Sequence, residues 1–179
     1  MNPVRDLVRD TRGSAAAELM LVMPILLIIM MGAFELGNYF RSEHILVQGL
    51  RDGARYAARQ SFSSYRDNCA ATFPNTNQIW IDTLNVVRTG QVSGGSDRLP
   101  NWTDPSTDFQ VAVTCSSTAG TQSMLGIYRD NKSSTGTPIG APIVTVSAHV
   151  PYRSILGKYG FTGIGMSLNG KQQAAVMGI

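Results

Sequence analysis

A group of residues near the N-terminus has the types and spacing of a cleavable junction. Gly13 has no side chain, and the residues from Ser14 to Ala17 are all small. A peptidase must bind an extended backbone around the bond that it cuts, and small side chains let that backbone enter a narrow cleft. Glu18 follows at the start of a long apolar segment. The small residues around Gly13 are therefore compatible with hydrolysis of a peptide bond in this stretch.

Cleavage would give Glu18 a specific role. A free α-amino group has a pKa of about 7.7–8.0, so a new N-terminus on Ser14 would be mostly charged at neutral pH. An anion is favoured at a helix N-terminus, and helical side chains lean toward that end. Glu18, one turn further on, is therefore placed to pair with this ammonium on its own chain or on a neighbouring chain. The alternative is that Glu18 extends toward the cytoplasmic headgroups.

The segment that follows is long enough to cross a membrane. Leu19 to Phe34 carry no charge. From Ser14 to Glu35 a helix rises about 31 Å at roughly 1.5 Å per residue, and the hydrocarbon core of a bilayer is about 30 Å thick. Glu18 and Glu35 therefore fall near the two edges of one membrane-spanning helix. Glu35 is either an interfacial residue or an assembly contact.

Three further features define this span, which we place at residues 14–40. Pro24 removes a backbone donor and predicts a kink near residues 20–24. Tyr39 to Arg41 suit the headgroup boundary. A secretory signal has its small-residue cleavage site after the apolar stretch, and the sequence after this stretch offers no such site. The apolar segment is therefore predicted to remain in the mature protein.

Residues 41–62 are predicted to extend the same helix as an amphipathic segment. Its apolar stripe has helical spacing and consists of Leu46, Leu50, Ala54 and Ala57 or Ala58. A second stripe contains Arg51, Arg55 and Arg59. The arginines have three interpretations: a solvated face, contacts with the chain's own globular part, or a docking stripe for a partner subunit or anionic lipid.

Composition and motifs argue against nucleic-acid binding and catalysis. The chain has 15 Lys and Arg against 12 Asp and Glu, and the excess is concentrated in residues 41–66. A nucleic-acid surface needs aromatic or motif support that is missing here. His44 and His149 lie far apart without acidic neighbours, and the sequence has neither a G-x-S-x-G elbow nor a phosphate-binding glycine loop. We therefore predict no enzyme activity, no metal site and no cofactor.

The two cysteines give information on the cellular compartment of the C-terminal part of the chain. Cys69 and Cys115 are the only ones, both follow the span, and they form no CxxC motif. An even number of cysteines in an exported domain suggests a disulfide, although two buried free thiols remain an alternative. A disulfide would place the C-terminal part outside the cytoplasm.

Residues 63–179 are predicted to form a small α+β domain. A helix is expected over residues 77–88, capped by Asn75 or Thr76 and ended by Gly90. A surface loop is expected over residues 91–108. Alternating apolar residues predict strands over residues 109–115 and 143–152. Further strands are expected over residues 124–130 and 163–177, the last as a strand or a hairpin, and the sheet is expected to be antiparallel.

The junction and the helix together resemble a known family. The stretch "RGSAAAELMLVMPILLIIMMGAFELG" is similar to the opening of TadE-like proteins of tight-adherence (Flp) pilus systems. The shared pattern is an R-G-x-x-x-x-E leader, an apolar helix with an early proline, and a second glutamate near "FELG". The resemblance continues through "LRDGARYAAR", residues 50–59, and covers about a third of the chain. It implies a type IV pilin-like fold.

The resemblance also implies a function. It predicts a non-catalytic minor pilin, or pseudopilin, that acts in pilus assembly or initiation and hence in surface adhesion. The chain would sit in the bacterial inner membrane with its globular part in the periplasm, and incorporation into the extracellular pilus is a further option. The implied partners are a prepilin peptidase, other pilins and pseudopilins, the assembly platform and the bilayer. The implied residues are Gly13 and Ser14 for processing, after a cytoplasmic leader of residues 1–13, and Glu18, Pro24 and Glu35 for assembly.

A second hypothesis uses the same helix differently. The chain would be an uncleaved single-pass anchor that carries a binding domain in the periplasm. It would then keep residues 1–13, which distinguishes the two hypotheses.

Overall fold

The computed structural model describes residues 14–100, 102–116, 118–119, 122–123, 126–159 and 165–178. The chain divides into two compact units. One unit combines Met1–Tyr39 with Ser154–Thr162, and the other combines Phe40–Arg153 with Gly163–Ile179. The predicted leader, residues 1–13, lies outside the described residues.

The N-terminal helix, α2, spans Ser14–Ala58 and continues through Pro24. We expected it to end near residue 62, and it ends four residues earlier. The carbonyl of Ala57 accepts a hydrogen bond from the Tyr65 hydroxyl at 2.5 Å, and the carbonyl of Ala58 accepts one from the Met177 amide at 2.9 Å. These tertiary partners take carbonyls that a longer helix would have used itself.

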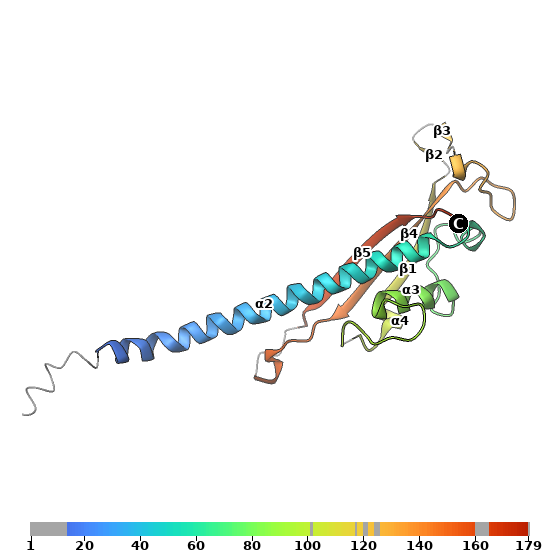
Figure 1. Ribbon diagram of the computed structural model, residues 1–179. Helices are drawn as coiled ribbons and strands as arrows, with labels where there is room; N and C mark the ends of the chain where they lie inside the picture. The colour runs from blue at the N-terminus through green and yellow to red at the C-terminus, as the bar shows by residue number, and fades with distance from the viewer. Residues whose placement is uncertain are drawn as a thin grey trace, which may run out of the picture. The chain divides into compact units, whose positions relative to one another are not determined.

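A three-stranded antiparallel sheet forms the centre of the second unit. Its strands are β1 (Phe109–Ser116), β4 (Ala141–Pro151) and β5 (Ser167–Ala175), in the order β1-β4-β5 (Figure 1). Three predicted strands are confirmed, because one face of the alternating pattern is buried as its spacing requires. The buried residues of this face include Phe109, Val111, Val113, Val144, Val146, Ala148, Val150 and Leu168.

The remaining elements are short. They are the 3-10 helices η2 (Phe62–Ser64), η3 (Gly126–Tyr128) and η4 (Leu156–Tyr159), the four-residue helix α4 (Pro105–Asp108), and the paired strands β2 (Thr118–Ala119) and β3 (Gln122–Ser123). Helix α4 lies at the end of the loop that we predicted over residues 91–108. The predicted fold class, α+β with a long N-terminal helix leading into a helix-and-sheet unit of pilin-like layout, is confirmed.

The strand predicted over residues 124–130 is wrong. Residues 126–128 form η3, and Gly126 takes a φ of 71°, which is outside the strand region. The Tyr128 hydroxyl donates to the carbonyl of Val176 at 2.9 Å, and its ring packs edge-on against Phe62 at 5.9 Å. These contacts with distant residues override the local strand preference of the segment.

Helix α3 spans Gln78–Thr89, and its predicted N-cap needs correction. Asn77 is the cap, because its side chain accepts from the amide of Ile79 at 2.8 Å. The Asn77 amide bonds back to the carbonyl of Pro74 at 2.9 Å, so the residues we expected to cap the helix belong to the preceding turn. The predicted stop at Gly90 is confirmed by its φ of 83°.

Two helices cover the buried face of the sheet. Trp80 of α3 meets Phe109 edge-on at 5.4 Å, and Trp102 meets the same ring at 6.1 Å. A Cβ atom placed on Gly170 of β5 would overlap the Leu50 side chain of α2. Gly170 therefore lets α2 lie close over β5, while α3 lies over β1.

The two helices touch each other through glycines. A Cβ atom on Gly49 would lie 2.5 Å from the backbone oxygen of Val87, and a Cβ on Gly53 would overlap Val87 Cγ2. Because Gly49 and Gly53 are four residues apart, they lie on one face of α2.

Substitution of these glycines is expected to destabilise the second unit. Gly49→Ala should lower the free energy of unfolding by about 1–3 kcal/mol, because a backbone carbonyl cannot move aside. Gly53→Ala meets a side-chain methyl, so adding Val87→Ala should offset part of its cost but leave the cost of Gly49→Ala unchanged. Urea unfolding, followed by the fluorescence of the buried Trp80 and Trp102, measures the free energy of unfolding of each variant. Equal rescue of the two glycine variants would contradict the packing described here.

Candidate functional site

The first half of α2 exposes apolar side chains on every side. All residues from Ala16 to Phe34 are exposed, and the helix is long and apolar enough to cross a membrane. An amphipathic helix packed on a core would bury one stripe, and this segment buries none within the structure. Such a surface requires lipid or other apolar helices around it. Its large members include Leu19, Met20, Leu21, Ile25, Leu26, Ile28, Ile29 and Phe34.

The predicted junction lies at the start of this helix. Gly13 falls outside the described residues, and Ser14 is the first residue of α2. Glu18 is exposed, one helical turn beyond Ser14. The geometry therefore keeps Glu18 within a turn of the bond that we expect to be cut, and the processing and assembly roles remain predictions.

Glu35 has partners in its own chain. Its Oε2 atom accepts hydrogen bonds from the backbone amides of Ile155 at 3.1 Å and Leu156 at 3.2 Å. These amides lie at the beginning of η4, in the connection between β4 and β5. The sequence predicted the position of Glu35 at the edge of the span, but it gave no signal for this contact.

The second half of α2 is amphipathic as predicted. Its apolar stripe is buried, with every member at most 5% exposed, and comprises Leu46, Leu50, Ala54, Ala57 and Ala58. The arginine stripe is exposed and comprises Arg51, Arg55 and Arg59.

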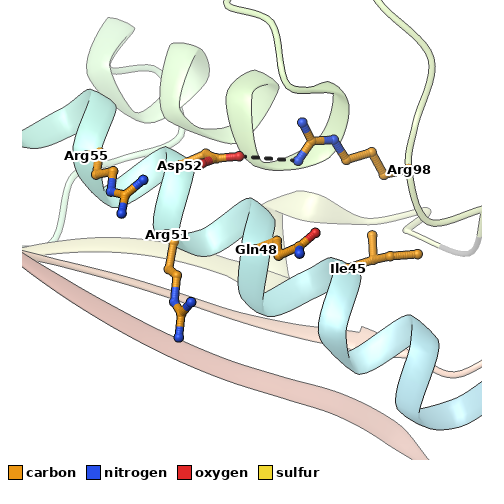
Figure 2. A pocket seen from close by; sticks show the side chains of 6 residues that line it. All are labelled: Ile45, Gln48, Arg51, Asp52, Arg55 and Arg98. Carbon is orange, nitrogen blue, oxygen red and sulfur yellow. Dashed lines mark ion pairs between the residues drawn. The ribbon is translucent and has the colours of Figure 1, made fainter.

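Part of the arginine stripe lines a groove of about 570 Å³ (Figure 2). Arg51 and Arg55 contribute from α2, and Arg98 contributes from the loop after α3. Asp52 forms an ion pair with Arg98 at 3.5 Å. Three guanidinium groups and one carboxylate line the groove, so it has a positive charge excess and suits an anionic partner.

Sequence reasoning missed Arg98. It lies in a loop rich in Gly, Ser and Pro, 46 residues from its partner Asp52. No local spacing connects the two, and only the packing of α3 on α2 brings them together. Arg59, which the stripe included, is absent from the residues that line the groove.

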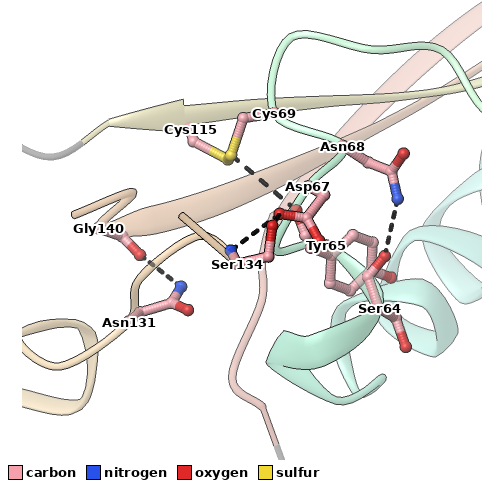
Figure 3. The surroundings of a disulfide bond; sticks show 9 residues. All are labelled: Ser64, Tyr65, Asp67, Asn68, Cys69, Cys115, Asn131, Ser134 and Gly140. Atoms are coloured by element: carbon pink, nitrogen blue, oxygen red, sulfur yellow. Dashed lines mark hydrogen bonds between the residues drawn. A yellow bond between two sulfur atoms is a disulfide. The ribbon is translucent and has the colours of Figure 1, made fainter. Parts of the chain in front are cut away.

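The predicted disulfide between Cys69 and Cys115 is confirmed (Figure 3). It joins the segment after η2 to the end of β1. Beside it, the amide of Phe73 donates to the carbonyl of Val111, and the amide of Val113 donates to the carbonyl of Ala71, each at 2.8 Å. The disulfide and these bonds hold residues 69–73 along the outer edge of β1, which protects that edge from further strand pairing.

Two ionisable groups near the disulfide have shifted pKa values. Hydrogen bonds from the backbone amide and the hydroxyl of Ser134 lower the pKa of Asp67. Burial raises the pKa of the Tyr65 hydroxyl. Both shifts favour the form present at neutral pH, so Asp67 stays ionised and Tyr65 stays neutral. Neither group is poised for proton transfer at neutral pH.

The described part of the chain holds no group of three or more His, Cys, Asp or Glu side chains that could bind a metal ion. His149 instead contacts the Asn169 side chain at 2.5 Å on the open face of the sheet. His44 contacts Gln48 at 2.9 Å, one turn along α2.

Comparison with known families addresses the segment that contains the junction and the exposed helix. Residues 13–55 match the family model of TadE-like proteins. The match confirms the resemblance inferred from the sequence, and it begins at Gly13. This TadE-like segment, residues 13–55, includes Glu18, Pro24 and Glu35. No curated protein and no solved structure matches the chain.

The TadE-like segment does not coincide with one structural unit. It includes the exposed apolar helix, the buried glycines Gly49 and Gly53, and Arg51 and Arg55 of the groove. The sheet and the disulfide lie beyond it. The family pattern therefore covers the helix and its first packing contacts, while the rest of the second unit is outside the match.

Proposed function

We propose that this chain is a non-catalytic minor pilin, or pseudopilin, of a tight-adherence pilus. The observation that carries the proposal is the TadE-like match, which begins at Gly13 and continues through a helix whose apolar side chains are exposed on every side. A prepilin peptidase would cut between Gly13 and Ser14. The mature helix would then join other pilin helices in a bundle.

Two features of the chain support the membrane orientation that we propose. The leader, residues 1–13, precedes the span and would lie in the cytoplasm. The disulfide between Cys69 and Cys115 lies after the span and favours an oxidising compartment. The second unit would therefore lie in the periplasm, and the chain would be anchored in the inner membrane until it is assembled.

Assembly would rest on pairing between an amine and a carboxylate. The ammonium created on Ser14 and the carboxylate of Glu18 both lie at the start of the apolar helix. Charges within a bilayer are stabilised by pairing, so apposition of these groups from neighbouring subunits would set the axial position of each helix. The implied partners are other pilins and the inner-membrane assembly platform.

The positive groove suits contacts outside the membrane. Arg51, Arg55 and Arg98 present guanidinium groups that bind carboxylates well. The groove would therefore bind an acidic surface of a neighbouring subunit.

Deletion of the gene tests the assembly role. We expect a large loss of surface pili, counted by electron microscopy, and a matching loss of surface attachment, both restored by the wild-type gene. Restoration by a variant that lacks residues 14–40 is not expected, because the second unit alone lacks the apolar half of α2 that would enter the bundle. Normal piliation after deletion would contradict an assembly role and favour the uncleaved anchor.

A further inference from the structure

Glu35 marks a change in the surface of α2. Every residue from Ala16 to Phe34 is exposed, and Glu35 is the first that is half-buried. Its carboxylate accepts the amides of Ile155 and Leu156. Residues 154–159 belong to the same compact unit as α2 up to Tyr39. The connection between β4 and β5 is therefore held against the helix at Glu35.

In a span that begins at Ser14, Glu35 would lie at the outer edge of the membrane. It lies 21 residues after Ser14, a helical rise of about 31 Å, against a hydrocarbon core of about 30 Å. A carboxylate at this level is stabilised by donors, and here two backbone amides point at one of its oxygens. Because these amides belong to the loop, the same bonds that stabilise the carboxylate also fix the loop at this level.

The loop carries an apolar side chain outward. Ile155 is 56% exposed, although it is among the largest apolar side chains of the loop. Leu156 is half-buried beside it. On the helix, Phe34 and Leu36, which flank Glu35 in the sequence, are 66% and 55% exposed. The apolar surface of the span therefore continues onto the loop at the level where Glu35 holds it.

We propose that the loop of residues 154–157 binds the periplasmic surface of the bilayer, with Ile155 inserted at the boundary between headgroups and acyl chains. Glu35 is the positioning residue that sets the depth of the loop. Side chains that combine an apolar body with nearby polar groups are favoured at this boundary. A lipid occupant is favoured over a protein partner because the surface is continuous with a span exposed on all sides. The inference requires the helix to span a membrane, but it does not require cleavage after Gly13.

Spin-label accessibility measures the depth of the loop directly. Both native cysteines are joined in the disulfide, so a single added cysteine can be labelled in the full-length protein. The variants are Ile155→Cys and, as a matched control, Ile127→Cys, which is 59% exposed in η3 of the second unit. Each protein is reconstituted in vesicles of phosphatidylethanolamine and phosphatidylglycerol, and collisions with oxygen and with a water-soluble nickel complex are compared.

For the label at residue 155 we expect collisions with oxygen to exceed those with nickel, as for a lipid-exposed site, and the reverse at residue 127. Equal nickel accessibility at the two positions would overturn the proposal. Protection of residue 155 from both reagents would also overturn it, because the label would then be packed against protein.

The role of Glu35 has its own readout. In the Ile155→Cys background, Glu35→Ala should raise nickel accessibility several-fold toward the value at residue 127 and make the label more mobile. Glu35→Gln keeps an oxygen acceptor, so it should change the nickel accessibility and the mobility of the label less than Glu35→Ala does. Tryptophan fluorescence of Trp80 and Trp102 verifies that the second unit stays folded in each variant. If Glu35→Ala leaves the protein folded and does not change the nickel accessibility or the mobility of the label at residue 155, Glu35 does not position the loop. All these proteins are produced without the peptidase and retain residues 1–13, so the result does not depend on whether the peptidase can process the chain.

Discussion

Replacing both Cys69 and Cys115 by serine is expected to lower the free energy of unfolding of the second unit by about 4 kcal/mol. The disulfide closes a loop of 46 residues, and a cross-link of that length removes about this much chain entropy from the unfolded state. The stability of an ordinary domain is only about 5–15 kcal/mol, so the loss would be a large fraction of the total. Urea unfolding in detergent, followed by the fluorescence of Trp80 and Trp102, measures it.

Reduction of the wild-type protein is the matched control. The reduced protein and the double variant share the same unconstrained unfolded chain, so their midpoints should agree. The segment of residues 69–73 should also exchange its amide hydrogens faster, because only the bonds to β1 would then hold it. A midpoint shift equivalent to less than about 1 kcal/mol would show that the loop is already restricted without the disulfide.

Replacing Glu18 by alanine is expected to reduce surface pili by about 100-fold while leaving cleavage after Gly13 normal. The Ser14 ammonium would then lack its carboxylate, and a charge left unpaired inside a bilayer costs up to about 2.5–3.5 kcal/mol, which corresponds to roughly this factor in an assembly equilibrium. The junction from Gly13 to Ala17 is unchanged, so the peptidase should still cut it. Piliation is counted by electron microscopy and cleavage is followed by the mass of the N-terminal peptide.

Two variants separate the charge of Glu18 from its other properties. Glu18→Gln has nearly the same size without the charge and should lose pili like the alanine variant. Glu43→Ala removes a carboxylate beyond the apolar segment and should leave piliation close to normal. Full piliation of Glu18→Gln would mean that the carboxylate charge is dispensable, and loss of cleavage in Glu18→Ala would place Glu18 in substrate recognition instead.

Periodic patterns account for what could be predicted of the fold. The alternation around Val111 and Val146 predicted two strands, because alternate residues of each strand lie on the same buried face of the sheet. The four-residue spacing of Leu46, Leu50 and Ala54 identified the buried stripe of α2 for the same reason. In each case the spacing of apolar residues along a short segment matches the face of the element that packs on the core.

The failures arose where distant contacts decide the local structure. The segment around Ile127 has strand-forming residues, yet Tyr128 contacts Val176 and Phe62, which both lie far from it in the sequence. Helix α2 ends where Tyr65 and Met177 donate to its carbonyls. These contacts depend on the tertiary fold and leave no periodic signal in the sequence.

In the candidate site too, features that are local in the sequence could be predicted, and contacts between distant residues could not. Gly13, Glu18 and the apolar helix are close in sequence, so their spacing pointed to the junction and to the TadE-like family. The contact of Glu35 with Ile155 joins residues 120 positions apart, and the pair of Arg98 with Asp52 joins residues 46 positions apart. Residue types mark such positions as polar, but only the packing of the chain identifies their partners.

The central claim is that the chain is processed between Gly13 and Ser14, and its N-terminus tests this most directly. The full chain is purified from membranes of cells with and without an active prepilin peptidase, and its intact mass and N-terminal peptide are determined. We predict that the protein begins at Ser14 with the peptidase and at Met1 without it. A protein that keeps Met1 in the presence of an active peptidase, or that begins elsewhere than Ser14, would contradict the account.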